Sequence, residues 1–248
     1  MSERLLAAIG NLAAVPFTAL GDRSNLLTRY DRKYAVSMRG AIDLVDALAP
    51  DWLVVVVDDE RSPSYHTTYL DDFGRTSLHD HLKERRRRYK VRVRTYANGA
   101  TFLEVKTKDG RGQTDKRRVE RTSSSTVLGS SELDWLSEQL PDVDVRALRP
   151  ELVVEYQRIT LLGPTGDERL TIDHMLRVGR GDSRHPLLDE GALVEVKSTR
   201  PHSSVSRTLW RVGGRSVSFS KYCAGVSVVD PTIHPRSRTL AERVVARG

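Results

Sequence analysis

The sequence has one cysteine, Cys223, among its 248 residues. A single thiol excludes a disulfide framework and any zinc or iron–sulfur site built from several cysteines. Long apolar runs are also missing, since the longest unbroken aliphatic stretch, Leu53 to Val57, is far too short for a membrane-spanning helix. No Walker A, G-x-S-x-G or G-x-G-x-x-G motif occurs, which argues against P-loop, α/β-hydrolase and Rossmann chemistry.

Aromatic residues are scarce, at 6%, whereas basic residues are abundant: 40 Lys and Arg stand against 33 Asp and Glu, a net charge of +7. The positive balance favours anionic partners. Nucleic acid is not expected among them, because single-strand binders use aromatic stacking platforms and no nucleic-acid motif appears. Apolar residues make up 38% and charged residues 29%, as in a globular chain long enough for one large domain.

The N-terminal segment 1–28 is predicted to form a docking helix region. Leu5, Ile9 and Leu12 share one helical face. The alternative is a secretory signal, which Asn11 and Pro16 argue against because they interrupt the apolar run. We therefore expect a cytoplasmic protein without a membrane segment.

Most of the remaining chain is predicted to form strands with short helices between them. The clearest turn signal is Asn98-Gly99, which predicts a hairpin between strands 88–96 and 101–108. Ser37 is a predicted N-cap for a helix that Pro50 ends. The other predicted strands cover 53–57, 65–71, 113–121, 152–161, 168–175 and 192–197; further helices cover 77–85, 132–140 and 204–212; and 231–248 is a basic tail.

One face of each predicted strand is densely charged, in strand after strand, while the other is apolar. The side chains concerned are Lys90, Arg92 and Arg94; Glu104 and Lys106; Lys116 and Arg118; Tyr156 and Arg158; Arg169 and Asp173; and Glu195 and Lys197. The charged faces either meet water, or they line the interior of a closed barrel. Repulsion between neighbouring cationic strands is the difficulty with the first arrangement.

An interior charged face would hold more cations than anions. The cations are Lys33, Arg92, Arg94, Lys106, Lys116, Arg158 and Arg169, and the carboxylates are Glu104, Asp173 and Glu195. Desolvated cations need partners, and arginine fits phosphate oxygens bidentately. Carboxylates in a phosphate site usually hold Mg²⁺ or Mn²⁺, so the pattern indicates phosphoryl transfer.

These residues fall into motifs that resemble the VTC-type (vacuolar transporter chaperone) polyphosphate polymerase domain, within the CYTH-like triphosphate tunnel metalloenzymes. The motifs are Arg29-Tyr30-Asp31-Arg32-Lys33-Tyr34, Tyr65-x-Thr67-x-Tyr69-x-Asp71, Arg92-x-Arg94-x-Tyr96, Leu103-Glu104-Val105-Lys106, Lys116-x-Arg118, Arg149-Pro150, Tyr156-x-Arg158, Arg169-Leu170-Thr171-Ile172-Asp173, Glu195-Val196-Lys197 and Phe219-Ser220-Lys221-Tyr222. Two positions depart from the family pattern: Asp31 stands where a glutamate is usual, and Ser218 where eukaryotic members carry a lysine.

The resemblance implies an α+β fold, with an eight-stranded antiparallel β-barrel tunnel and flanking helices over residues 29–230. It implies transfer of the ATP γ-phosphate to a growing polyphosphate chain, with Mn²⁺ or Mg²⁺ as cofactor. The phosphate-binding residues would be Lys33, Arg92, Arg94, Lys106, Lys116, Tyr156, Arg158, Arg169, Ser220 and Lys221. Of these, Lys33, Arg92, Arg94, Arg158 and Lys221 would be catalytic. Glu195 would hold the metal, with Glu104 and Asp173 as further candidates.

Other interpretations remain open at this point. A triphosphatase of the same fold would use the same cations with water as acceptor, and a non-catalytic module would only bind polyphosphate. Glu195 could be a simple ion-pair partner of Lys197, and Glu104 a counter-ion of Lys106. The basic run from Lys83 to Arg88 is either a solvated face or a guide for anions. His79 and His81 are expected at the surface.

Overall fold

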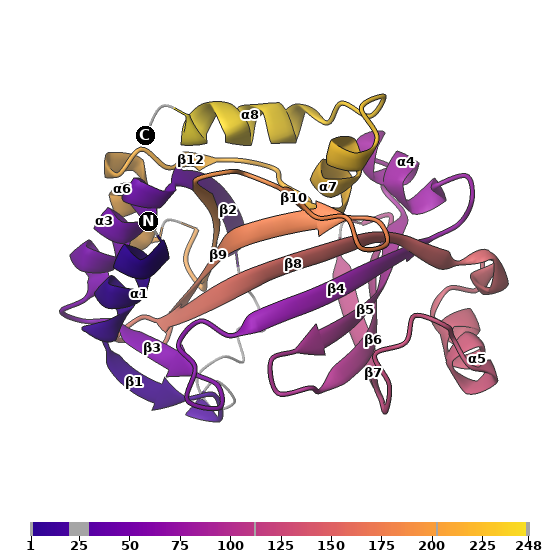
Figure 1. Cartoon of the computed structure of the whole chain (residues 1–248), viewed down its shortest axis with the longest axis horizontal. Helices are drawn as coiled ribbons and strands as arrows, with labels where there is room; N and C mark the ends of the chain where they lie inside the picture. Colours follow the sequence, from indigo (N-terminus) through magenta and orange to yellow (C-terminus); the bar gives the residue numbers. More distant parts are fainter. Residues whose placement is uncertain (1, 20–29, 112, 202, 247–248) are drawn as a thin grey trace.

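The computed structural model describes residues 2–19, 30–111, 113–201 and 203–246, which form an α+β fold (Figure 1). The helices are α1 (Ser2–Gly10), α3 (Met38–Leu48), α4 (Thr76–Leu82), α5 (Ser130–Gln139), α6 (Ser204–Arg211), α7 (Lys221–Val229) and α8 (Arg236–Val245). The strands are β1 (Ala13–Pro16), β2 (Tyr30–Ser37), β3 (Leu53–Val56), β4 (Ser64–Asp71), β5 (Arg88–Tyr96), β6 (Thr101–Lys108), β7 (Thr114–Arg121), β8 (Arg149–Leu162), β9 (Glu168–Gly179), β10 (His185–Pro186), β11 (Gly191–Ser198) and β12 (Arg215–Ser216).

One sheet holds the molecule together, in the order β12-β2-β11-β9-β8-β4-β5-β6-β7. Its eight long strands each run antiparallel to their neighbours. In the described residues no ladder joins β7 to β12, so the sheet is open there; the predicted α+β class and antiparallel strands are confirmed, whereas the closed eight-stranded barrel is not. The edges explain this: β12 is two residues long, and β7 is a charged strand with mostly exposed side chains, so neither offers a long complementary partner.

The apolar faces of the strands are covered by helices α1, α3 and α6. Ile159, Leu170 and Val194 from the sheet pack against Leu44 of α3 and Leu209 of α6. The predicted capping of α3 is confirmed, since the Ser37 hydroxyl accepts a hydrogen bond from the Gly40 amide. A separate apolar cluster, centred on Val91, Val105 and Leu136, joins β5 and β6 to α5.

Helix α7 packs on the opposite, charged face of the sheet, at the end where that face becomes apolar. Tyr222 stacks on Tyr69 of β4, with ring centroids 4.9 Å apart. At Gly225 an added Cβ would lie 2.6 Å from a methyl group of Leu152, so a glycine allows the helix to approach β8 this closely. This contact fixes where the charged part of the face ends.

The two ends of the chain both contribute to packing. Leu5 and Ile9 of α1 are buried against the α3 layer, and Ala241 of α8 is buried in the cluster around α7. The boundary predicted near residue 29 lies outside the described residues, and the predicted domain limits stay predictions. No helix in the described part of the chain is both long and apolar enough to cross a membrane.

Candidate functional site

The sheet curls so that its charged face becomes concave. Lys33 lies on β2 and Lys106 on β6, with five strands between them in the sheet order. Even so, Lys33, Lys106 and Ser220, which precedes α7, line one cavity. Burial first, and then charges that include Lys106 and Lys221, lower the pKa of Lys33 to about 8. The charged side chains of β2, β6 and α7 therefore face a common interior.

Glu104 is the centre of a first cluster, on β5, β6 and β7. Its carboxylate lies 2.6 Å from an Arg92 nitrogen, 2.8 Å from Lys116 Nζ and 3.7 Å from Arg94. Burial alone would raise the pKa of Glu104, but these three cations hold it well below its usual range. The carboxylate is only 1% exposed and is already saturated with cations. It is an internal counter-ion, as expected, but to Arg92 and Lys116 rather than to Lys106.

Asp173 of β9 is the centre of a second cluster. It pairs with Arg158 of β8 at 2.5 Å and with Lys221 at the start of α7. Tyr156 lies against the same cations, with Arg158 5.3 Å and Lys221 Nζ 4.6 Å from its ring centroid. Its ring also stacks on Tyr65, at 5.1 Å and 6°.

The Tyr156 hydroxyl is buried and has no hydrogen-bond partner among the described residues. Burial alone would raise its pKa, but Arg94, Arg158 and Lys221 outweigh that effect and lower it. A buried polar group without a partner is costly in a folded protein. An anion that enters between these cations would give the hydroxyl the acceptor it lacks.

A third cluster joins β2, β11 and the segment before α7. Glu195 is paired in register with Lys33 and lies 2.6 Å from Lys197 Nζ. Lys33 Nζ donates to the Phe219 carbonyl at 2.7 Å, which leaves its remaining protons for a ligand. Arg169 lies beside Lys197 on the neighbouring strand β9.

The fit of a divalent metal can be judged from these carboxylates. Across the described ranges no group of three His, Cys, Asp or Glu side chains could form a metal cage. Mg²⁺ is usually bound by one or two carboxylates together with substrate phosphates, so a single available carboxylate suffices. Glu195 is 21% exposed, against 1% for Glu104 and 2% for Asp173. Burial would raise its pKa, yet Lys197 and Lys33 lower it to about 2, so Glu195 is ionised and fits this role best.

A cavity of about 1110 Å³ opens from this interior between the two edges of the sheet. Lys33 and Ser216 line it from the β2 and β12 side, and Lys106 and Thr114 from the β6 and β7 side. Ser220 lies at its inner wall. The cavity therefore lies between the unpaired edges of the described sheet, and it shares Lys33, Lys106 and Ser220 with the charged interior.

The start of α7 supplies two of the predicted phosphate ligands. Ser220 is its N-cap and accepts hydrogen bonds from the Cys223 amide and from Lys90 Nζ, which leaves the Ser220 hydroxyl proton for a ligand. A carboxylate holds the helix in place: Asp71 accepts a hydrogen bond from the Tyr222 hydroxyl at 2.6 Å. The same carboxylate accepts from the Ser77 and Leu78 amides, so it also anchors α4.

Sequence reasoning missed some residues of this interior. Lys90 was recognised as part of the charged alternation but given no role, although it lines the cavity and donates to Ser220 at 2.9 Å. His81 was expected at the surface, which was wrong: it is partly buried in the cavity wall, and Lys90 lies 2.9 Å from its Nε2. The signal that could have given Lys90 a role is its position two residues before Arg92, on the same face of the strand.

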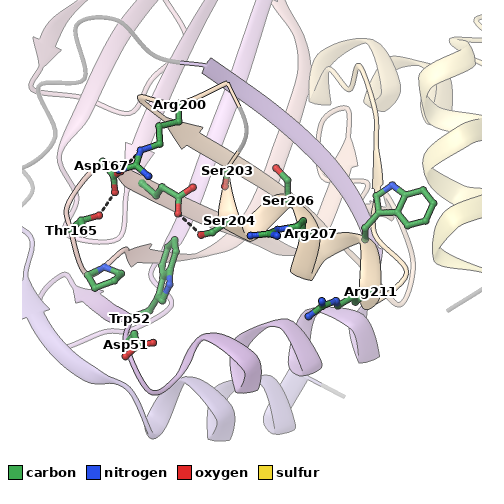
Figure 2. A pocket seen from close by; sticks show the side chains of 13 residues that line it. Asp51, Trp52, Thr165, Asp167, Arg200, Ser203, Ser204, Ser206, Arg207 and Arg211 are labelled. Carbon is green, nitrogen blue, oxygen red and sulfur yellow. Dashed lines mark hydrogen bonds and ion pairs between the residues drawn. The ribbon is translucent and has the colours of Figure 1, made fainter.

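A second cavity, of about 1010 Å³, lies on the helix-covered side of the sheet (Figure 2). It is lined by both signs of charge. Arg200 pairs with Asp167 at 3.3 Å, and Ser204 donates to Glu168 at 2.8 Å (Figure 2). None of the predicted site residues lies in it, so the charged interior is the stronger candidate site.

Comparisons with known proteins agree with this geometry. A protein from Hippeastrum, provisionally named an adenylyl cyclase and described with a dominant triphosphatase activity, superposes with a TM-score of 0.54 at 16% identity, over 81% of this chain and 96% of its own. A protein from Bacillus halodurans, provisionally named an adenylate cyclase, gives 0.52 at 14% identity, over 77% of this chain and 92% of its own. At these identities the likeness shows a shared fold. No curated protein sequence matches the chain.

The VTC domain family matches residues 28–230, which include every strand of the concave face. The resemblance seen in the sequence motifs is thereby confirmed, and the chain belongs to the VTC domain family.

Proposed function

We propose that the chain is a metal-dependent polyphosphate polymerase, which transfers the γ-phosphate of ATP to the end of a growing polyphosphate chain. The observation that supports this most directly is the convergence of Arg92, Arg94, Arg158 and Lys221 on one interior. The VTC family membership and the shared fold support a polyphosphate- or triphosphate-related enzyme. The cytoplasm, predicted from the sequence, is a compartment that supplies ATP.

In the proposed reaction the bond between the γ-phosphorus and the β,γ-bridging oxygen breaks. A terminal phosphate oxygen of the chain forms the new bond, and ADP leaves. The transferred group carries negative charge throughout, so catalysis consists mainly of positioning and charge neutralisation. Lys33, Arg92, Arg94, Arg158 and Lys221 are the catalytic residues in this proposal.

The remaining predicted ligands have supporting roles. Lys106, Lys116 and Arg169 neutralise phosphates further along the chain. Tyr156 and Ser220 donate hydrogen bonds to phosphate oxygens, since among the described residues neither hydroxyl proton has another acceptor. Mg²⁺ or Mn²⁺, held by Glu195 together with phosphate oxygens, would neutralise charge on the transferred group.

The decisive experiment is incubation of the purified chain with ATP and Mn²⁺ or Mg²⁺, with the products separated on a gel. The proposal predicts long phosphate polymers and ADP. Free phosphate without polymer would indicate a triphosphatase of the same fold. Binding of polyphosphate without turnover would indicate a binding module.

A further inference from the structure

The cavity between the sheet edges is lined by several basic side chains that have no part in the proposed catalytic centre. Beyond Lys33 and Lys106, its lining includes five basic side chains with no role so far: Arg32, Lys83, Arg88, Lys90 and Lys108. Only two carboxylate residues, Asp31 and Glu84, line the same cavity. The outer part of the cavity is therefore strongly positive.

These outer cations differ from the inner ones in their partners. Inside, Arg92 is neutralised by Glu104 and Arg158 by Asp173. Within the described ranges none of the five outer cations forms an ion pair. Cations of one sign along a cleft concentrate the field there and attract an anion from solution.

Lys90 connects the outer part to the inner part. It donates to Ser220 at 2.9 Å and lies 2.9 Å from Nε2 of His81, so its ammonium group is fixed at the junction. Burial lowers its pKa to about 7, with Lys33 and Lys106 adding to the effect. A phosphate at this point would remove the repulsion among the three lysines.

The shape and lining of the cavity indicate what kind of anion would fit. Its volume, about 1110 Å³, lies above the range of roughly 300–1,000 Å³ that is typical of small-molecule pockets. The large aromatic rings in its wall, those of Tyr89 and Phe219, are buried. The other rings that line it are the smaller imidazoles of His81, which is partly buried, and His234, which is exposed. A flexible chain of phosphates matches the lining better than a nucleoside does.

We propose that Lys83, Arg88, Lys90 and Lys108 form a second phosphate-binding subsite, which holds the part of a polyphosphate chain that lies beyond the catalytic centre. The subsite gives the protein a preference for long chains over triphosphate. This inference rests on the proposed function for the identity of the chain, but the preference itself is a binding property and is tested without ATP or metal.

The test uses the variant Lys83→Gln/Lys108→Gln. Among the residues that the structure describes, neither side chain forms a hydrogen bond or an ion pair. Binding of inorganic triphosphate and of long-chain polyphosphate is measured by calorimetry at constant ionic strength. The wild type should bind the long chain more tightly, and the variant should lose about tenfold in long-chain affinity while its triphosphate affinity changes less than about twofold.

The matched control is Arg207→Gln/Arg211→Gln on α6. It removes two cations that line the second cavity on the helix-covered side of the sheet, and neither of them is among the residues that line the cavity between the sheet edges. Its affinities should stay at the wild-type values. If the control loses as much as the test variant, net charge explains the effect and the subsite is excluded.

Two further results would overturn the proposal. One is an equal loss of triphosphate and long-chain affinity in the test variant, and the other is no loss of either. Failure of the proposed function would be a separate result. In that case the wild-type protein would make no polymer from ATP, whether or not it prefers long chains.

Discussion

At the scale of single residues, Glu104, Asp173 and Glu195 in the charged interior differ in how many cations they contact and in how exposed they are. Glu104 and Asp173 are almost fully buried, and each holds at least two cations. Glu195 has one close partner, Lys197, and the largest exposed fraction. The same residue type therefore serves as a structural counter-ion at two positions and is available to a ligand at the third.

Replacing Glu195 by glutamine should separate binding from turnover. The variant keeps the size of the side chain and loses the charge that attracts a divalent ion. We expect it to fold, to bind triphosphate at least as tightly as the wild type, and to make essentially no polymer from ATP and Mn²⁺. Binding of Mn²⁺ with triphosphate, followed by electron paramagnetic resonance, should weaken in parallel. Near-wild-type synthesis would remove Glu195 from the mechanism and leave Asp173 or Glu104 as metal candidates.

Tyr156→Phe should weaken ligand binding without harming the fold. The hydroxyl has no partner in the described structure, so its loss leaves no group unsatisfied and the free energy of unfolding should stay level or rise. Triphosphate affinity should fall by about 0.5–1.5 kcal/mol, the usual net value of one hydrogen bond. Calorimetry and urea unfolding test the two halves of this prediction. Unchanged affinity would show that the hydroxyl does not reach the ligand.

At the scale of secondary-structure elements, α7 adds further candidate phosphate ligands to the charged face of the sheet. It brings Ser220 and Lys221 to the interior, and its packing on Tyr69 sets their depth. Asp71 ties it to β4 and α4 through the Tyr222 hydroxyl. The position of two proposed phosphate ligands therefore depends on one buried carboxylate that does not itself touch the ligand.

The link between Asp71 and α7 can be tested with Tyr222→Phe. The ring and its stacking on Tyr69 remain, while the hydrogen bond to the carboxylate is lost. We expect a loss of about 1.5–3 kcal/mol in the free energy of unfolding, measured by urea denaturation, since the acceptor is charged and buried. Tyr30→Phe is the control, because Tyr30 is 47% exposed, and it should change stability by less than about 0.5 kcal/mol. Equal losses in both variants would contradict the role of the hydrogen bond.

Most of the sheet could be predicted from local patterns, but α7 could not. Asn98-Gly99 marked the hairpin because a tight turn between strands needs a residue that tolerates positive φ, and Gly99 has φ of 81°. Residues 221–229 combine β-branched residues with Gly225 and carry no helical signal of their own. They form a helix because they pack against β8 and β9, and such tertiary contacts are not visible in the sequence.

At the scale of the whole molecule, the charged residues were identified from alternation, whereas the shape that brings them together was not. Alternation assigns side chains to one face of a sheet, and the excess of cations argues for an enclosed face. Closure depends on whether the two edge strands can pair, and β12 is too short to do so. The sequence pattern alone could not distinguish a closed barrel from a curled, open sheet.

The charge of the whole cavity should respond to pH near neutrality. Burial lowers the pKa of Lys90 to about 7, so it loses its proton between about pH 6 and pH 8 in the free protein. A bound polyanion favours the charged form and raises that pKa. The groups that face Lys90 are His81 of α4, Ser220 and Cys223 of α7, Arg92 of β5, Lys106 of β6 and Lys33 of β2.

Long-chain polyphosphate should therefore bind more weakly at pH 8.5 than at pH 6.5, and binding at pH 8 should take up protons. Calorimetry in buffers of different ionisation enthalpy measures this uptake directly. Lys90→Met should reduce it. Proton release on binding, or an uptake that is the same in the variant, would contradict the assignment of Lys90.

The open side of the sheet has a consequence for how a long molecule enters and leaves. A closed ring admits a linear polymer only by its end, and a finished chain must slide out along its whole length. In the part of the chain that the structure describes, no strand pairing joins β12 to β7, and a cavity lies between these edges. Under the proposed function, a polyphosphate chain can therefore bind laterally, at any point along its length, and dissociate in the same way. The time needed for release then need not grow with the number of phosphate units added.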